Sequence, residues 1–276
     1  MESTVVAQGQ GISFAYKSRP LFSDLGFTLE SGNIYGLLGK NGAGKSTLLK
    51  ILSGQLFARS GSLKVLGSDP SKREAKLLGE IFYLNEEFSL PRMHSHHYCA
   101  MLAPFYRRFD QRAFVSYAKE FELDLSQRLD QMSLGQKKKY LLCFGLASNT
   151  RLVIMDEPTN GLDIPSKRQF RQIVARAMSE ERTFIISTHQ VRDMEGLIDP
   201  IIILEQGQVI FNDRLDTVGD RYVIERTSAE PEGEVLYKER LLGGWMVLKE
   251  RSAAPGGQNL DLETLFNILV AKGGRI

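Results

Sequence analysis

Residues 39–46 read Gly-Lys-Asn-Gly-Ala-Gly-Lys-Ser, and they lie between an apolar run at 34–38 and a stretch of helical character at 47–52. Glycine has no Cβ, so the three glycines let the backbone turn tightly and point successive N–H groups inward. The partial positive charge at the start of the following helix adds to the attraction for anions. The order of strand, Gly-x-x-x-x-Gly-Lys-Ser loop and helix favours a phosphate-binding loop over an ordinary glycine-rich turn.

The polar side chains of this loop are expected to bind a nucleotide and its metal ion. Lys45 is expected to reach the β and γ phosphates as a point charge, and the Ser46 hydroxyl to ligate the Mg²⁺ that bridges them. One such loop is present, which predicts a single nucleotide module. The nucleotide contacts predicted from this segment are Gly39, Lys40, Asn41, Gly42, Ala43, Gly44, Lys45, Ser46 and Thr47.

The composition of the 276-residue chain is that of a globular protein. An apolar content of 42% is enough for an ordinary core. The 35 basic and 33 acidic residues leave a net charge of +2, which disfavours nucleic acid or anionic lipid as a partner. Cys99 and Cys143 lie far apart in apolar surroundings, which predicts reduced core thiols. We expect no signal peptide at residues 1–10 and no membrane-spanning segment.

The alternation of short apolar runs with helical stretches predicts an α/β fold. Compact apolar runs at 152–155 and 183–187 flank a polar-faced helix at 165–178, a pattern typical of parallel strands with crossover helices. Further expected elements are a helix ending near 53, a strand near 62–66, a helix near 71–78, a strand at 81–84, a mostly helical region at 93–147, and a hairpin of 200–205 with 208–212.

The start of the chain is rich in short β-forming runs. Those at 12–16, 26–30 and 34–38 are separated by turn residues such as Ser31-Gly32-Asn33. We therefore expect these three runs to form an antiparallel sheet that leads into the phosphate loop.

The composition changes near Gly219. Loops rich in Gly and Pro are expected at 228–234 and 252–258, which predicts a small α+β accessory domain at 219–276. Its closing helix is expected to begin after an N-cap at Asp261. We expect the apolar face of this helix to pack on the accessory domain itself, with a dimer or regulatory contact as the alternative. That face carries Leu262, Leu265, Phe266 and Leu269 at helical spacing.

Two carboxylates, Asp156 and Glu157, follow the apolar run at 152–155 directly. Asp156 is expected to hold Mg²⁺ directly or through water, and Glu157 to polarise a water for attack on the γ phosphate. A surface Asp-Glu pair of no special function is the alternative. The residues that follow, Pro-Thr-Asn-Gly-Leu-Asp at 158–163, make the pattern specific.

Several segments together resemble the nucleotide-binding subunit of ATP-binding cassette (ABC) transporters, in family order and at similar spacing. The resemblance covers about residues 5–215. It implies ATP as the ligand and an ATP-binding domain at 5–218, built as a P-loop NTPase core with an N-terminal antiparallel β subdomain and a helical subdomain at about 90–147. The matching segments are 39–46, Ser133-Leu134-Gly135-Gln136, 152–157, 160–163 and His189.

The resemblance implies roles for residues outside the phosphate loop. The family works as a head-to-tail dimer, so Ser133 and Gly135 of one chain, with Gln136, would cap the γ phosphate held by the other. The usual signature carries Gly at the position of Leu134. Asp163 would act across the dimer. His189 would contact the γ phosphate, and Tyr16 would stack on adenine, although a histidine or aromatic residue at a strand end is often structural.

One position departs from the family pattern. After the strand at 81–84 the family commonly has a glutamine that touches Mg²⁺ and couples to the membrane partner, whereas this chain has Asn85-Glu86-Glu87. Glu86 is the best-aligned substitute, and a glutamate also ligates Mg²⁺. The predicted metal ligands are therefore Ser46, Asp156 and Glu86.

The segment at 88–110 is expected to face the membrane partner. It holds His94, His96 and His97, whose spacing matches no common metal site and favours a polar docking or solvated surface. Its aromatic cluster of Phe105, Tyr106 and Phe109 fits either a core face or an exposed patch for a permease helix. Lys137, Lys138 and Lys139, which follow the signature, are expected to form a solvated helix face.

The function that these features predict is ATP hydrolysis for transport. Two copies, or one copy with a related chain, would close around Mg·ATP on the cytoplasmic face of the membrane and drive separate permease subunits, with Lys45, Glu157 and His189 as the catalytic set. Asp-Glu-Pro-Thr-Asn-Gly-Leu-Asp at 156–163 together with Gly-Leu-Leu-Gly at 36–39 resembles exporter subunits of prokaryotes, and this resemblance implies export rather than import. The alternatives are a soluble cassette ATPase that acts on DNA or ribosomes, and a module that holds ATP without turnover. The sequence shows neither a long coiled-coil insertion nor a second cassette, which argues against the first alternative. The complete catalytic set argues against the second.

Overall fold

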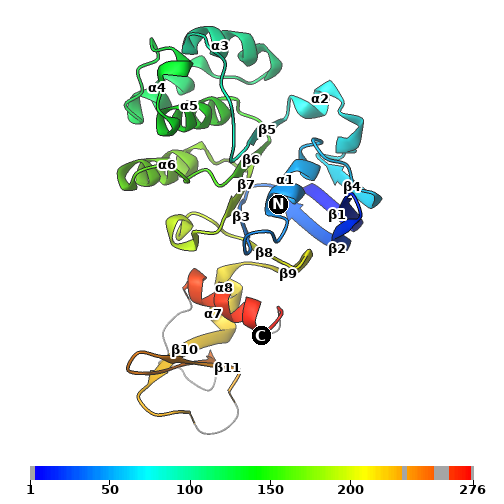
Figure 1. Cartoon of the computed structure of the whole chain (residues 1–276), viewed down its shortest axis with the longest axis vertical. Helices are drawn as coiled ribbons and strands as arrows, with labels where there is room; N and C mark the ends of the chain where they lie inside the picture. The colour runs from blue at the N-terminus through cyan, green and yellow to red at the C-terminus, as the bar shows by residue number, and fades with distance from the viewer. Residues whose placement is uncertain (1–3, 232–234, 252–260, 275–276) are drawn as a thin grey trace.

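The computed structural model describes residues 4–231, 235–251 and 261–274 (Figure 1). The loops predicted at 228–234 and 252–258 therefore lie partly and wholly outside the described residues. Among the helices in the described ranges, none combines the length and the apolar character that crossing a bilayer requires.

A six-stranded sheet forms the centre of the molecule, in the order β5-β6-β7-β3-β8-β9. The first five strands run parallel and β9 is antiparallel to β8. Every residue of β3, β6 and β7 is buried, because helices or a second sheet cover both faces. The strands are β3 (Ile34–Leu38), β5 (Ile81–Leu84), β6 (Leu152–Asp156), β7 (Thr183–Thr188), β8 (Ile201–Glu205) and β9 (Gln208–Asp213).

A smaller antiparallel sheet at the N-terminus, in the order β2-β1-β4, contains two of the three runs expected there. The prediction that residues 34–38 belong to it is wrong. The bend after β2 carries the chain into the other sheet, where β3 pairs in parallel with β7 and β8. The antiparallel strands are β1 (Val5–Tyr16), β2 (Arg19–Glu30) and β4 (Ser60–Val65).

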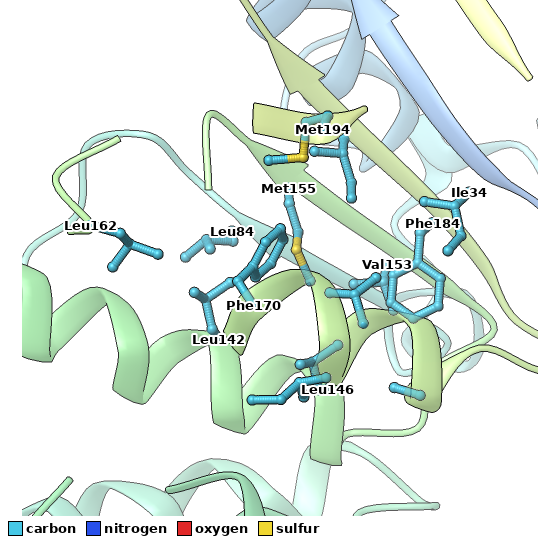
Figure 2. Packing of buried hydrophobic residues seen from close by; sticks show 14 of the residues in the cluster. Ile34, Leu84, Leu142, Leu146, Val153, Met155, Leu162, Phe170, Phe184 and Met194 are labelled. Atoms are coloured by element: carbon cyan, nitrogen blue, oxygen red, sulfur yellow. The ribbon is translucent and has the colours of Figure 1, made fainter. Parts of the chain in front are cut away.

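Helix α1 (Lys45–Leu52) packs between the two sheets. Its residues Leu48 and Leu52 share one buried cluster with Phe22 of β2 and Ile154 of β6. Alternate residues of β6 point to opposite faces of the sheet, so Val153 and Met155 pack in a second cluster on the other side (Figure 2).

The second cluster is covered by helices α3 (Ser95–Leu102), α4 (Gln111–Glu120), α5 (Leu134–Ala147) and α6 (Ile164–Ala177). Figure 2 shows Leu142 of α5 beside Phe170 of α6, and Phe184 of β7 beside Val153 of β6. Helices α3, α4 and α5 gather at one end of the molecule (Figure 1), which confirms the expected helical region. Both cysteines are free and buried.

The helix expected near 71–78 is divided into a 3-10 turn, Pro70–Lys72, and α2 (Ala75–Leu78). Arg73 interrupts it because its φ of 51° is left-handed, a conformation that cannot continue a right-handed helix.

The C-terminal part contains α7 (Leu215–Arg221), a sheet in the order β10-β12-β11, and α8 (Leu262–Ala271). Its strands are β10 (Tyr222–Thr227), β11 (Tyr237–Leu241) and β12 (Gly244–Glu250). Asp261 caps α8 as predicted, since its Oδ1 accepts a hydrogen bond of 2.8 Å from the Thr264 N–H.

The expectation that the apolar face of α8 packs on its own small domain is wrong for most of that face. Leu262, Leu265 and Leu269 belong to the large cluster under the central sheet, and Ile268 alone joins the cluster of the small sheet. Helix α8 contacts β9 and the 3-10 helix η4 (Val191–Met194), so it lies between the small sheet and the rest of the molecule (Figure 1).

Candidate active site

A cleft of about 760 Å³ opens beside the carboxyl ends of the central strands, the place where open parallel sheets bind ligands. The phosphate loop follows β3, Glu86 follows β5, Glu157 follows β6 and His189 follows β7. The predicted site residues that line the cleft are Tyr16, Asn41, Gly42, Gly44, Lys45, Ser46, Thr47, Glu86, Glu157 and His189. Gly39, Lys40 and Ala43 shape the same loop without lining the cleft, and Asp156 is buried next to Glu157.

The phosphate loop depends on glycine at its last turn. Gly44 has a φ of 108°, and a Cβ at this position would lie 2.7 Å from a ring carbon of Phe22. Helix α1 begins at the next residue, with its N-terminus at the cleft. The loop and helix therefore form a cradle for an anion, and a side chain at position 44 would strain this loop and clash with Phe22.

Lys45 is held against this loop. Its Nζ donates hydrogen bonds to the Gly39 carbonyl at 2.7 Å and to the Lys40 carbonyl at 3.4 Å. The residue is 7% exposed, and burial lowers the pKa of its ammonium, while the charges of Glu157 and Asp156 oppose that shift. A cation fixed at this place fits the phosphates of a nucleotide.

Asp156 and Glu157 are tied together by Ser187, which pairs with Asp156 across β6 and β7. The Ser187 Oγ donates to Asp156 Oδ1 at 2.5 Å and accepts from the Glu157 N–H at 3.0 Å. Glu157 has a φ of 47°, which is left-handed and costs a non-glycine residue roughly 1 kcal/mol or more. The surrounding hydrogen bonds thus hold a strained backbone that turns the Glu157 side chain to the cleft.

The Glu157 carboxylate has one satisfied oxygen and one free oxygen. Its Oε1 forms a hydrogen bond of 2.8 Å with His189 Nδ1, whereas its Oε2 is buried without a partner among the described residues. Burial raises the pKa of Glu157, and the hydrogen bond and charge of His189 oppose that shift. A buried carboxylate oxygen without a partner is costly unless it binds a water or a ligand, so this atom is available as a base.

Glu86 takes part in a polar network at the rim of the cleft. Asn160 donates from Nδ2 to Glu86 Oε1 at 3.0 Å, and Gln190 donates from Nε2 to Asn160 Oδ1 at 3.4 Å. In the described ranges no group of three or more His, Cys, Asp or Glu side chains is arranged to hold a metal ion. Mg²⁺ commonly binds to one or two carboxylates together with substrate phosphates. Asp156, whose charge acts on Lys45 directly before Ser46, fits that pattern.

Comparison with known proteins identifies the family. The model of the ABC transporter family matches residues 22–160. The lantibiotic transport ATP-binding protein SrtF of Streptococcus pyogenes is 30% identical over 209 residues, which are 75% of this chain and 90% of the relative. The chain belongs to the ABC transporter family. It is an ATP-binding subunit with ATPase activity.

Two further matches agree with this membership. The Nod factor export ATP-binding protein I of Mesorhizobium japonicum is 28% identical over 222 residues, which cover 75% of this chain and 63% of that protein. A solved structure of an ATP binding subunit of an ABC transporter superposes with a TM-score of 0.69 at 23% identity, over 77% of this chain and 91% of that one. The fold is thus that of the ABC nucleotide-binding domain.

The remaining predicted residues of this ABC subunit lie outside the cleft. Ser133 and Gln136 cap the start of α5 reciprocally: Ser133 Oγ accepts from the Gln136 N–H at 3.2 Å, and the Ser133 N–H donates to Gln136 Oε1 at 2.8 Å. Asp163 caps α6 through its Oδ1, which accepts from the Ser166 N–H at 2.8 Å. A Cβ added to Gly135 would lie 3.2 Å from the Gly161 carbonyl, so the two segments are neighbours.

Tyr16 lies at the cleft, and the aromatic cluster is divided between the core and the surface. Tyr16 is 49% exposed at the cleft, where its Oη lies 3.1 Å from Thr47 Oγ1. Of the aromatic cluster, Tyr106 and Phe109 pack on the large core, whereas Phe105 is 70% exposed.

Several residues of the site are not recognisable from the sequence. Ser187 is visible only once the register places it beside Asp156. Lys138 contradicts the expected solvated lysine face, since it is 3% exposed. The turn Gln206-Gly207 has a recognisable hairpin pattern, but nothing local places it at the cleft. Residues Arg19, Pro20, Leu21, Gln206 and Gly207 complete the lining.

The raised pKa of Glu157 predicts a pH-dependent gain in stability for Glu157→Gln in the nucleotide-free protein. The folded chain binds the Glu157 proton more tightly than the unfolded chain does, so stability from this group is lost as pH rises through the folded pKa. Glutamine has no such loss, so we expect the stability advantage of the variant over the wild type to grow as pH rises. Denaturant unfolding should show this difference vanish at acidic pH, and the exposed Glu181→Gln should show none.

Proposed function

We propose that this ABC subunit powers export through separate membrane-spanning subunits, at the cytoplasmic face of the membrane. The observation that carries the proposal is the cleft, where Lys45, Glu157 and His189 converge from the ends of three neighbouring strands. The relative named for Nod factor export supports the direction, and the relative named for lantibiotic transport supports transport. The accessory domain at 219–276 stays part of this proposal, although its expected border falls within α7.

The residues of the cleft suit hydrolysis of a nucleoside triphosphate. We propose that the loop N–H groups and Lys45 bind the phosphates, and that Ser46, Asp156 and Glu86 hold Mg²⁺, which neutralises charge on the β and γ phosphates. Glu157 accepts the proton of the attacking water at Oε2. His189, oriented by its bond to Oε1, contacts the γ phosphate, and Tyr16 stacks on the base.

A second copy of the chain completes each site in this proposal. Support comes from Ser133, Gly135, Gln136 and Asp163, which present a helix start and polar groups away from the cleft of their own chain. Such a start attracts anions, so the signature of one chain would cap the phosphates in the other.

Ser133→Arg tests the second copy. Wild-type ATPase activity per chain should rise with protein concentration, because two chains must meet. The variant should lose at least about 10-fold of that activity, since a bulky cation blocks the interface, while nucleotide binding to the isolated chain remains. Ser179→Arg, at an exposed serine after α6, is the control. Full activity of Ser133→Arg would show that the signature does not act on ATP.

The transport function is tested by isolating the protein from native membranes. Recovery with a membrane-spanning protein whose presence changes the ATPase rate supports the proposal. Recovery with ribosomes or nucleic acid instead would contradict it. Lys45→Ala distinguishes ATP hydrolysis by this protein from hydrolysis by contaminating ATPases. The loss of the loop cation should remove nucleotide binding and hydrolysis together.

A further inference from the structure

Lys138 is a buried cation on the helix that begins at the signature. It lies in the second turn of α5 and is 3% exposed. Its Nζ donates a hydrogen bond of 3.1 Å to the backbone carbonyl of Glu157, and it lies 6.0 Å from the centre of the Phe88 ring. Burial of an ammonium is costly unless charge and hydrogen bonds offset the cost. The surroundings of Lys138 must therefore supply both.

The compensating charge comes from two acidic residues of the cleft and from Asp156, which is buried beside it. Burial lowers the pKa of Lys138, and the charges of Glu86, Glu157 and Asp156 oppose that shift, with Glu86 first. The chain thus combines a carboxylate at the cleft with a buried ammonium whose charge interacts with it.

The hydrogen bond of Lys138 falls on the strained residue of the site. Glu157 has a left-handed φ of 47°, and its carbonyl also accepts from the Asn160 N–H at 3.2 Å. Its own N–H is held from the other side by Ser187. A cation on the carbonyl therefore fixes the peptide plane from which the Glu157 side chain extends to His189.

We propose that Lys138 is a positioning residue for ATP hydrolysis, which holds the Glu157 carbonyl and balances the charge of Glu86. It connects the helix that starts at Ser133 to the carboxylate at the cleft. The proposal rests on the proposed role of Glu157 as the base. Lys138 itself does not line the cleft, so its effect on hydrolysis passes through Glu157.

The first test compares Lys138→Met with Lys137→Met, the neighbouring lysine on the same helix, which is partly exposed. We expect Lys138→Met to lower kcat by about 30-fold and to leave the KM for ATP within about 3-fold, because the nucleotide contacts remain. Lys138→Arg should recover part of kcat, and Lys137→Met should stay within about 2-fold of the wild type. Equal effects of the two methionine variants, or a loss expressed in KM alone, would overturn the proposal.

The second test uses Glu86→Gln and needs no turnover. In nucleotide-free, EDTA-treated protein, Lys138→Met should lower Tm by roughly 5 °C, and by about half as much in the Glu86→Gln background, because the charge of Glu86 acts on Lys138 and interacting sites couple. Identical losses in both backgrounds would remove Glu86 from the proposal. If Lys138→Met does not fold, Lys138→Gln serves in both tests.

Different results would refute the role of Glu157 as the base and the role of Lys138 as a positioning residue. Wild-type hydrolysis by Glu157→Gln would refute the role of Glu157, whereas the thermal coupling of Lys138 to Glu86 does not depend on that role. If Glu157→Gln lowers the rate of hydrolysis but Lys138→Met leaves kcat unchanged, only the positioning role of Lys138 is refuted.

Discussion

Glu157→Gln is expected to lower the rate of ATP hydrolysis by about 10³-fold while ATP affinity stays within about 3-fold of the wild type. Glutamine keeps the shape of glutamate and an oxygen that accepts the hydrogen bond of His189, so the cleft retains its form. It loses the basic oxygen, which in Glu157 is the buried and unpartnered Oε2. The Glu157→Gln variant should therefore keep ATP binding and lose ATP hydrolysis.

Single-turnover hydrolysis of labelled ATP and binding of a fluorescent nucleotide measure the two quantities. Glu87→Gln is the matched control, since Glu87 is exposed, close in sequence to the cleft residue Glu86 and absent from the lining. Wild-type turnover by Glu157→Gln would remove this residue from the mechanism. A parallel loss of affinity would mean instead that its charge acts on the bound nucleotide.

Arg182→Met is expected to destabilise the fold by about 4 kcal/mol, with a decrease of Tm of roughly 10 °C. Arg182 is 6% exposed at the start of β7, and burial lowers the pKa of its guanidinium to about 10, so it remains a cation at neutral pH. It donates to the carbonyls of Leu146 at 3.1 Å, Ala177 at 2.9 Å and Thr150 at 3.3 Å. Methionine fills part of the space and removes the donor from these carbonyls, of which Leu146 keeps the Asn149 N–H at 3.5 Å.

Thermal and urea unfolding of the nucleotide-free protein check this expectation. Arg176→Met is the control, because the Arg176 side chain is 60% exposed and its ion pair with Glu120 is at the surface, where such pairs contribute within about 1 kcal/mol. A change for Arg182→Met no larger than for Arg176→Met would show that the carbonyls find other partners.

The features that sequence predicts well are those in which local chemistry decides the conformation. The phosphate loop needs glycine at a left-handed turn, and Asp156 and Glu157 end a run whose continuous apolarity indicates a strand covered on both faces. The expectation for residues 34–38 is wrong because an apolar strand carries no mark of the sheet that it joins. Its partners, β7 and β8, lie more than a hundred residues later in the chain.

The features that sequence does not predict depend on packing between distant elements. Lys138 lies in a run of three lysines, so no periodicity of apolar residues distinguishes the buried one. Ser187 acquires its role from the register between two strands. The apolar spacing of α8 predicts a buried face correctly, but the identity of the surface that covers it follows from tertiary packing alone.

Helix α8 brings the C-terminal part of the chain close to the cleft. The 3-10 helix on which α8 packs, η4, follows His189 after one intervening residue, and Arg192 of η4 forms an ion pair with Glu263 of α8. The same contact buries Val191 and Met194. The C-terminal helix thus supports the segment that follows the histidine at the cleft, and a ligand or mutation that shifts α8 would reach that histidine through a short path of packed residues.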